Sequence, residues 1–329
     1  MKIVHIGDIH YCDKYLDEVQ RCMESAISNI IVIKPDLIVL AGDLFDHKLD
    51  QNSAAFIEAV NMVYSLAMEA PVLILQGTFS HDAPGSLDVF TRVGSDITYP
   101  IVVVDKICQV YFSCLTFSTF PFMSVDNIPI TPMGGVILSC LPTINKANVA
   151  AAVGVDAAGT ELGNQVSILL QSWAPVHEAA RKAGIPSVVI SHGTVSESVT
   201  EHGVPMAGLD HEYTTGSLFA AKADVVMLGH IHKMQVWYNQ SYGFDQTIAY
   251  PGSIGRLHYG EIGDKGFFLH EFDKGVISNE TIVTPAKRLV DLTYDKMPDM
   301  ETLAEAAKDC EGAFVRIRFS VDEEHRASV

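Results

Sequence analysis

Positive charge is scarce in this sequence, in which 22 Lys and Arg residues stand against 40 Asp and Glu residues and give a formal net charge of −18. Nucleic-acid-binding proteins usually carry a basic surface. We therefore expect the isolated chain to bind DNA weakly and a partner to supply basic surface, although a phosphatase for small substrates would explain the same acidity. Acidic residues that bind metal ions would account for part of the excess, because the ions neutralise them.

Long apolar runs and paired cysteines are also missing. No run reaches the roughly 18 apolar residues of a membrane span, and the first candidate motif begins at Gly7, which leaves no room for a signal peptide. The six cysteines form no C-x-x-C pair and no regular disulfide framework, so we expect reduced thiols. These absences predict a cytoplasmic protein without a membrane segment.

What remains predicts a well-packed α/β protein. With 329 residues, of which 48% are hydrophobic, the chain can form one large domain and a smaller one. Strand-like apolar runs alternate with stretches of helical apolar spacing, which predicts a layered sheet with helices on its outside. The predicted strands cover residues 3–6, 37–41 and 72–75, and the predicted helices cover 15–33 and 52–69.

The middle of the chain has a different pattern. Residues 101–140 contain short apolar runs broken by Pro and Gly, which is typical of antiparallel strands. Small and polar residues at 144–166 indicate a loop or lid, and a helix is predicted from 167 to 183. In the polar segment 195–215, His202 and His211 are expected on the surface, because loops are usually solvated.

The pattern changes once more after Pro285. A strand, a helix and a second strand are predicted at 289–294, 300–309 and 314–319. This piece is too short to fold as an independent domain. We therefore divide the chain into a main domain, 1–285, and a partial C-terminal domain, 286–329.

Five short stretches, each directly after a strand-like run, supply Asp or His. Ligands at the ends of several strands converge on one edge of a sheet, where the binding sites of layered α/β folds lie. A mixed set of carboxylates and imidazoles of this size suits a pair of divalent metal ions better than one structural zinc. One such stretch alone would more often be a turn, but five in order are hard to explain that way. They are Gly7–His10, Gly42-Asp43, Ser80–Asp82, Ser191–Gly193 and Gly229–His232.

The last of these stretches is the most specific. His230 and His232 are two residues apart after a strand, so the alternation of side chains points both to the same side. We expect Gly229 to allow the tight turn that precedes them.

The order of the stretches resembles the calcineurin-like metallophosphoesterases, whose motifs read D-x-H, G-D, G-N-H-D, H and G-H-x-H. Within that superfamily the chain is similar to the SbcD-type DNA repair nucleases, from Met1 to about Phe272. The narrower resemblance is carried by Ala41–Asp46, Leu228–Lys233 and Tyr250–Arg256, the last followed by Tyr259-Gly260-Glu261. It implies a layered fold of two packed mixed β-sheets flanked by helices, with a small C-terminal α+β capping piece that is expected to be truncated.

The resemblance also implies a role for each motif residue. Asp43 would bridge two metal ions, and His81 would be the catalytic residue that protonates the leaving oxygen, a task that suits an imidazole. Asp82 would orient the His81 ring, Asp46 would hold a neighbouring His, and Arg256 would meet a phosphate or a surface acid. The implied ligands of one ion are Asp8, His10, Asp43 and His232, and those of the other are Asp43, Ser80, His192 and His230.

The third motif departs from the family pattern. It is two residues longer than Gly-Asn-His-Asp, and Ser80 stands where the family has its Asn ligand. A hydroxyl is a weaker ligand than an amide oxygen, so Ser80 would bind one ion less tightly, or Thr78 or water would take its place.

The function implied by the resemblance is that of a metal-dependent DNA nuclease, the exonuclease and endonuclease subunit of an SbcCD-like complex in DNA repair and recombination. Two manganese ions are expected, with zinc or iron as alternatives. The expected partners are DNA, an SbcC-like ATPase and a second copy of the chain, which would join through helices at 52–69 and 86–94. The region that binds the ATPase is expected to be absent from this chain. The alternatives are a phosphodiesterase or phosphatase for a non-DNA substrate and a non-catalytic scaffold with a decayed site.

Overall fold

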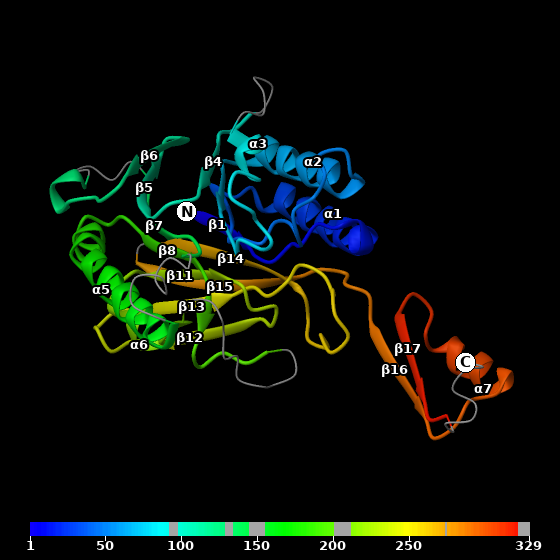
Figure 1. The fold of residues 1–329 in the computed structure, drawn as a ribbon. Helices are drawn as coiled ribbons and strands as arrows, with labels where there is room; N and C mark the ends of the chain where they lie inside the picture. Colours follow the sequence, from blue (N-terminus) through cyan, green and yellow to red (C-terminus); the bar gives the residue numbers. More distant parts are fainter. Residues whose placement is uncertain (92–97, 129–133, 145–154, 201–211, 274, 322–329) are drawn as a thin grey trace.

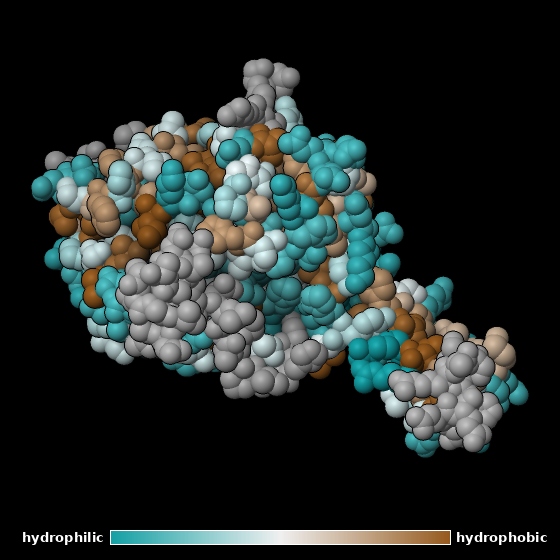
Figure 2. Space-filling model, viewed as in Figure 1, coloured by the Kyte–Doolittle hydropathy of each residue, from teal (hydrophilic) through white to brown (hydrophobic). Residues whose placement is uncertain are grey.

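The computed structural model describes residues 1–91, 98–128, 134–144, 155–200, 212–273 and 275–321. Two β-sheets pack face to face, helices cover their outer faces, and a small piece at the C-terminus projects from this body (Figures 1 and 2). Its helix and strands stand apart from the layers of the body. The predicted fold class, two mixed sheets flanked by helices, is therefore confirmed.

Among the described residues, the first sheet has six strands in the order β15-β14-β1-β2-β3-β4. Its four strands from β1 to β4 are parallel, and β14 and β15 extend it in antiparallel fashion. The parallel strands read as continuous apolar runs because both of their faces are buried. The bounds are β1 Lys2–Ile6, β2 Leu37–Leu40, β3 Val72–Leu75, β4 Ile101–Val104, β14 Gly266–Asp273 and β15 Val276–Val283.

The second sheet has seven strands in the described part of the chain, in the order β12-β13-β11-β8-β7-β5-β6. Strands β7, β8, β11 and β13 are parallel, while β5, β6 and β12 run antiparallel to their neighbours. A short parallel pair, β9 Thr194–Val195 and β10 Glu212–Tyr213, lies apart from this sheet. The bounds are β5 Cys108–Ser113, β6 Thr116–Phe120, β7 Val136–Leu141, β8 Ser187–His192, β11 Val225–Gly229, β12 Gln235–Asn239 and β13 Gln246–Tyr250.

Apolar side chains form a core in each space between the layers. Ile3 and Val39 of the first sheet pack with Val188 and Val225 of the second, which joins the two sheets. The other face of the first sheet packs against α1 and α2, and the other face of the second packs against α5 and α6. The helices are α1 Leu16–Ile33, α2 Ala54–Glu69, α3 Asp88–Thr91, α5 Val155–Lys182 and α6 Thr215–Ala220, with short 3-10 turns η1 Asp13–Tyr15 and η2 Val125–Asn127.

The loop predicted at 144–166 is partly wrong. Residues 145–154 lie outside the described residues, but α5 already begins at Val155. Its buried residues Leu162, Val166 and Leu170 follow helical spacing and pack against the second sheet. This packing outweighs the cost of glycine in a helix, about 1 kcal/mol per residue. The predicted surface histidines His202 and His211 lie outside the described residues.

The C-terminal piece is a βαβ unit. β16 Leu289–Tyr294 and β17 Phe314–Phe319 form a parallel pair, and α7 Met300–Lys308 connects them. Asp299 caps α7 by accepting a hydrogen bond from the N–H of Thr302 at 2.7 Å. In the described part of the chain, no helix combines the length and the apolar character that crossing a membrane would require.

A buried histidine of α5 makes the stability of this fold depend on pH. His177 is fully buried, with Nδ1 2.7 Å from the Ala221 carbonyl oxygen and Nε2 2.8 Å from Ser139 Oγ. Burial lowers the pKa of His177 from 6.5 to about 4. Between these values the unfolded chain takes up a proton that the folded chain does not, so the stability is present above pH 6.5 and is lost as the pH falls towards 4.

We expect this single histidine to lower the free energy of unfolding by about 3 kcal/mol between pH 6.5 and 4. Urea unfolding at a series of pH values measures the slope, and His177→Gln should have a flatter slope than the native chain. An unchanged slope in the variant would assign the acid sensitivity to other groups.

Candidate metal centre

The strands bring the predicted motif residues to one edge of the two sheets. The segment after β1 runs beside the segment after β2: the N–H groups of Asp8 and His10 donate to the carbonyl oxygens of Gly42 and Asp43, at 3.2 and 3.0 Å. The N–H of His230, after β11, donates to Asp8 Oδ1 at 2.8 Å. Both sheets therefore meet at this edge, where the carboxyl ends of β1, β2, β8 and β11 lie.

One group of potential ligands consists of Asp8, His10 and His232, each of which offers an atom within 4.8 Å of the others. The Nε2 atoms of His10 and His232 are 2.9 Å apart. Two nitrogens that bind one ion at about 2.0–2.1 Å and at a right angle are about 3 Å apart. The spacing of the two rings therefore fits a shared metal ion.

A second group consists of Asp43, His192 and His230, again with one atom from each within 4.8 Å. Asp43 Oδ2 is 3.2 Å from His192 Nε2 and 3.9 Å from His10 Nε2. The Asp43 carboxylate thus lies between the two groups. This is the position that a bridging carboxylate requires.

The ring of His192 is oriented for a metal ion. Its Nδ1 atom is 2.8 Å from the carbonyl oxygen of Ala41, so Nδ1 carries the proton and donates it. The other ring nitrogen, Nε2, is buried, makes no hydrogen bond with any described residue and lies 3.2 Å from Asp43 Oδ2, so a proton that Asp43 holds there is what a metal ion would displace. A buried nitrogen without a hydrogen bond is costly, and a metal ion would satisfy it. A backbone carbonyl on the other ring nitrogen is the usual support of a metal-binding His.

His232 has a carboxylate in the same supporting position. Its Nδ1 atom is 3.0 Å from Oε1 of Glu261, and the other oxygen of Glu261 accepts from the Leu257 N–H at 3.0 Å and lies 3.2 Å from Lys265 Nζ. Burial alone would raise the pKa of Glu261, but His232 and Lys265 lower it to about 2. In the sequence, Glu261 is notable only as the last residue of Tyr259-Gly260-Glu261, which is part of the resemblance to SbcD-type nucleases. Its contact with His232 could not be found from the sequence.

We expect Glu261→Gln to weaken metal binding by about 10–100-fold at the ion held by Asp8, His10 and His232, because the His232 ring loses its charged support. Calorimetric titration with Mn²⁺ measures this. Glu18→Gln is the matched control, since Glu18 is equally buried and accepts from the backbone N–H groups of Arg256 and Lys287 at 3.3 and 3.0 Å. Equal losses in the two variants would show a general disturbance of this region.

Two glycines allow the motif segments to pack closely. A Cβ atom on Gly77 would lie 2.2 Å from both the N and Oδ1 atoms of Asp43. A Cβ atom on Gly229 would lie 2.1 Å from the Ala41 carbonyl oxygen and 2.8 Å from His192 Nδ1. The structure therefore assigns Gly229 to close approach between strands, rather than to the tight turn expected from the sequence.

Four of the motif residues have a left-handed backbone conformation. The φ angles are +50° for Asp8, +54° for His10, +51° for Asp43 and +106° for His230. Such values cost a non-glycine residue roughly 1–2 kcal/mol each. The surrounding fold holds these residues in conformations that they would not adopt by themselves, as is common at functional sites.

His81 lies beside the two groups. Its Nε2 atom is 4.0 Å from Asp43 Oδ2, and its ring meets the His10 ring edge-on with centroids 4.7 Å apart. Its Nδ1 atom contacts the backbone carbonyl of Asp46. The Asp46 side chain lies 3.1 Å from His47 Nδ1 and 3.8 Å from His10 Nδ1, so Asp46 holds neighbouring histidines through both its carboxylate and its carbonyl.

Asp82 and Arg256 have partners other than those expected. Asp82 was predicted to orient His81, but its carboxylate accepts three backbone N–H groups, from Leu44, Phe45 and Gly77 at 3.0–3.3 Å. The Arg256 guanidinium donates to four backbone carbonyls, those of Glu261, Gly263, Ala286 and Lys287, at 2.7–3.0 Å. Through these bonds Arg256 ties the 256–263 loop to the residues that lead into the C-terminal piece.

The residue of the third motif that contacts Asp43 is Thr78. Its N–H and hydroxyl lie 2.7 and 2.8 Å from Asp43 Oδ1, and its side chain is buried. Ser80 is exposed. Thr78 directly follows Gly77, as the Asn ligand follows Gly in the family motif, so the two extra residues come after it.

The charged groups of the centre depend on one another. Burial alone would lower the pKa of His192, but Asp43 and Asp8 raise it to about 10. Burial and the nearby His192 lower the pKa of His230 to about 3. Although burial opposes it, the neighbouring His192, His10 and His81 hold the pKa of Asp43 below its usual range. The Asp43 carboxylate therefore stays ionised in a place where it needs cations around it.

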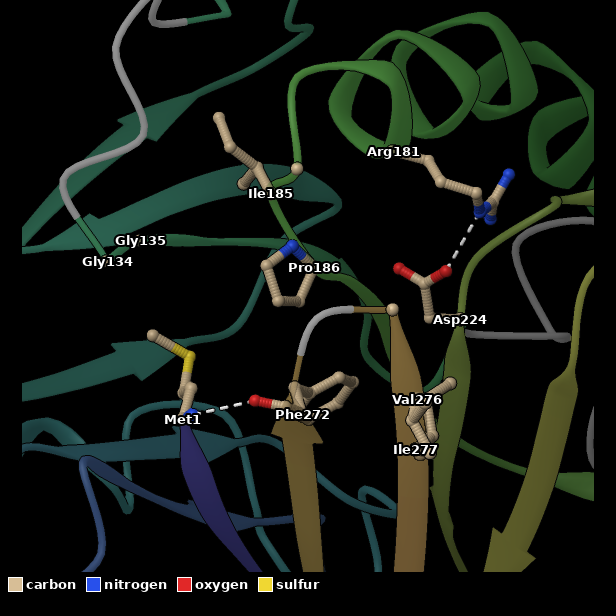
Figure 3. Close-up of a pocket in the computed structure, with 12 residues that line it drawn as sticks. Met1, Gly134, Gly135, Arg181, Ile185, Pro186, Asp224, Phe272, Val276 and Ile277 are labelled. Carbon is tan, nitrogen blue, oxygen red and sulfur yellow. Dashed lines mark hydrogen bonds and ion pairs between the residues drawn. The ribbon is translucent and has the colours of Figure 1, made fainter.

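A separate cavity of about 500 Å³ lies at the opposite edge of the sandwich, where β1, β8 and β11 begin (Figure 3). Met1, Pro186 and Phe272 line it, and Arg181 and Asp224 form an ion pair of 3.0 Å on its wall. The Met1 ammonium donates to the Phe272 carbonyl oxygen at 2.9 Å. None of the predicted site residues lines this cavity.

Residues 1–234 match the family model of the calcineurin-like phosphoesterases. The chain belongs to this family. Its groups of Asp and His are thus candidates for the dimetal site that is typical of these metallophosphoesterases. The match ends just after His232, so it includes all of the predicted metal ligands.

The proteins to which this phosphoesterase is similar include a nuclease subunit, an uncharacterized metallophosphoesterase and a dimetal phosphatase. The SbcD component of the SbcCD nuclease of Staphylococcus epidermidis is 25% identical over 301 residues, which are 89% of this chain and 71% of that protein. An uncharacterized metallophosphoesterase of Bacillus subtilis, YhaO, is 36% identical over 89 residues, 27% of this chain and 19% of YhaO. A dimetal phosphatase from Danio rerio has a solved structure with a TM-score of 0.53 at 12% identity, covering 86% of this chain and 96% of that one, and it supports the fold alone.

Proposed function

We propose that this phosphoesterase is a metal-dependent DNA nuclease of the SbcD type. The observation that carries the proposal is that similarity to an SbcD protein extends over 89% of the chain, well beyond the metal motifs. Glu261 belongs to that extended region and supports His232 at 3.0 Å. The stretch that distinguishes SbcD-type nucleases from generic phosphatases thus has a structural role beside the metal centre.

In the proposed assignment, Asp43 would be a ligand of both ions. Asp8, His10 and His232 complete one set of ligands, and His192 and His230 belong to the other. Thr78 or Ser80 would supply an oxygen to the second set. Manganese is the proposed metal, and zinc and iron also suit imidazole and carboxylate ligands.

A pair of bound ions neutralises the phosphate and lowers the pKa of an attacking water. The chain's own residues do the rest. Ala41 and Glu261 fix the rings of His192 and His232, and Asp82 holds the segments of Asp43 and Gly77 together through their N–H groups. His81 is proposed to donate a proton from Nε2 to the leaving oxygen, because its Nδ1 contacts the Asp46 carbonyl and its Nε2 faces Asp43 at 4.0 Å.

Cleavage of linear duplex and single-stranded DNA with and without Mn²⁺ tests the proposed function. We expect the full chain to degrade DNA slowly with Mn²⁺ and to stop when a chelator is added. Release of phosphate from a monoester such as p-nitrophenyl phosphate, with intact DNA, would instead support a phosphatase for a non-DNA substrate. The net charge of −18 is the observation that favours this second candidate.

The assembly proposed for this chain follows from the same relative. We propose an SbcC-like ATPase as partner, a homodimer formed through α2 and the segment that contains α3, and a cytoplasmic location. The division at residue 285 is also part of the proposal, with 286–329 as part of a capping domain. Nuclease activity that rises on addition of the ATPase, together with a dimer in light scattering, would support this assembly.

A further inference from the structure

A cavity of about 300 Å³ lies where the sandwich meets the C-terminal piece. Tyr15 at the end of η1 and the loop Arg256–Tyr259 line it on the side of the sandwich. Phe314 and Arg316 of β17 line it on the other side. The volume is at the lower end of the range of about 300–1,000 Å³ for small-molecule sites, so the cavity suits one planar ring system.

Three aromatic rings of this cavity each carry a cation. Lys14 Nζ lies 4.6 Å from the centroid of Tyr15, the Arg316 guanidinium 4.6 Å from that of Tyr259, and Lys287 Nζ 5.0 Å from that of Phe314. Two of these cations are lysines, and the third, Arg316, is paired with Asp291. Rings for stacking and cations beside them are the two elements with which proteins bind single-stranded nucleic acid.

A row of rings connects the cavity with the metal centre. The His258 ring is nearly parallel to that of His232, at 6° with centroids 6.1 Å apart. The Tyr15 ring meets His258 edge-on, with centroids 6.5 Å apart. His258 is exposed and lines the cavity. A ligand ring in the cavity would thus be one histidine away from His232.

The arginines of the cavity are already engaged. Arg256 donates to four backbone carbonyls, and Arg316 donates to both carboxylate oxygens of Asp291, at 2.5 and 2.6 Å. They hold the walls in place and leave few donors for the edge of a base. Stacking without edge contacts accepts every base, because each has a π face.

We propose that this cavity binds one nucleobase of the strand whose phosphodiester is at the metal centre. The inference rests on the proposed nuclease function, because a substrate without a base has no ring to place there. The occupant is a nucleobase rather than a lone anion, since the lining offers aromatic faces and no free guanidinium. The cavity therefore favours nucleotide esters over other phosphodiesters.

Two phosphodiesters with the same leaving group test this in the Mn²⁺-loaded full chain: thymidine 5′-(p-nitrophenyl phosphate) and methyl p-nitrophenyl phosphate. We expect kcat/KM to be at least about tenfold higher for the thymidine ester, as stacking of one base predicts. Tyr15→Leu combined with Tyr259→Leu should remove this preference and leave the methyl ester unaffected. Tyr238→Leu is the matched control, because Tyr238 is 70% exposed and does not line the cavity.

A binding measurement without turnover separates the cavity from the chemistry. The fluorescence of a dinucleotide that contains 2-aminopurine falls when the base stacks on a ring. This fluorescence is to be measured in the presence of a chelator, so that no hydrolysis takes place. We expect quenching with the native chain and with Tyr238→Leu, and none with the double variant, whose fold is checked by circular dichroism. Quenching without any ester hydrolysis would support the cavity and contradict the nuclease function.

The opposite result overturns the inference. If both esters are hydrolysed with equal kcat/KM and the dinucleotide is not quenched, the nucleobase site is wrong while phosphodiester hydrolysis stands. A preference that survives the double substitution overturns it equally. If the fluorescence of the free 2-aminopurine mononucleotide falls as much as that of the dinucleotide, the base alone is sufficient for binding. This result would also support a nucleobase site in the cavity.

Discussion

The Asp43→Ala variant is expected to lose both metal ions and to show no measurable hydrolysis. Asp43 lies between the two groups of ligands, 3.2 Å from His192 and 3.9 Å from His10, and it stays ionised. Its removal leaves each of the two proposed ligand sets with one carboxylate fewer. The metal content measured by mass spectrometry should fall from two ions per chain to fewer than about 0.2. The rate of hydrolysis should fall by at least the roughly 10³-fold that loss of metal catalysis implies.

Asp224→Ala is the matched control for this experiment. Asp224 is also a largely buried carboxylate with several partners, among them Arg181 and Ser187, but it lies at the opposite edge of the sheets. We expect this control to be less stable and to keep both ions. Two full ions in the Asp43 variant would show that another residue bridges the metals.

The His81→Ala variant is expected to keep its metals and to lose most of its hydrolytic rate. His81 is beside Asp43 and His10. It forms a further group of potential ligands with His10 and Asp46, but it belongs to neither of the two proposed ligand sets. General acid catalysis by a positioned side chain contributes about 10²–10⁴-fold to a rate. Single-turnover assays at saturating Mn²⁺, with metal content measured on the same sample, separate loss of the proton donor from loss of an ion.

The choice of substrate sharpens the His81 experiment. An ester with a p-nitrophenolate leaving group needs little protonation, so its hydrolysis should fall much less than that of DNA. His47→Ala is the control, because His47 is a neighbouring histidine whose side chain is 58% exposed. Equal losses on both substrates would mean that His81 contributes to binding rather than to proton transfer.

Most of the layered fold could be predicted because the buried strands are unmistakable in the sequence. The apolar runs at 3–6, 37–41, 72–75 and 225–228 lie between two cores, so their residues are apolar on both faces. The start of α5 could not be predicted because glycines lie among its apolar residues. Its apolar side is recognised only from its packing against the second sheet. Local patterns thus predicted the elements that the core surrounds.

Contacts between distant residues were the part of the site that could not be predicted. Glu261 meets His232 from 29 positions away, and Arg256 meets backbone carbonyls 30 and 31 positions away. No periodicity links such pairs. The hydrogen bonds of Asp82 could not be predicted for a similar reason: its carboxylate accepts from the N–H groups of Leu44 and Phe45, which lie 38 and 37 positions away in the sequence.

The left-handed backbone at Asp8, His10, Asp43 and His230 is a cost that this fold bears at the ends of its strands. Glycine at these positions would relieve the strain, but it would also remove the side chains that form the candidate metal centre. The fold therefore gives up local backbone stability to keep two carboxylates and two imidazoles at one place, and binding of an ion there would return stability to the folded chain.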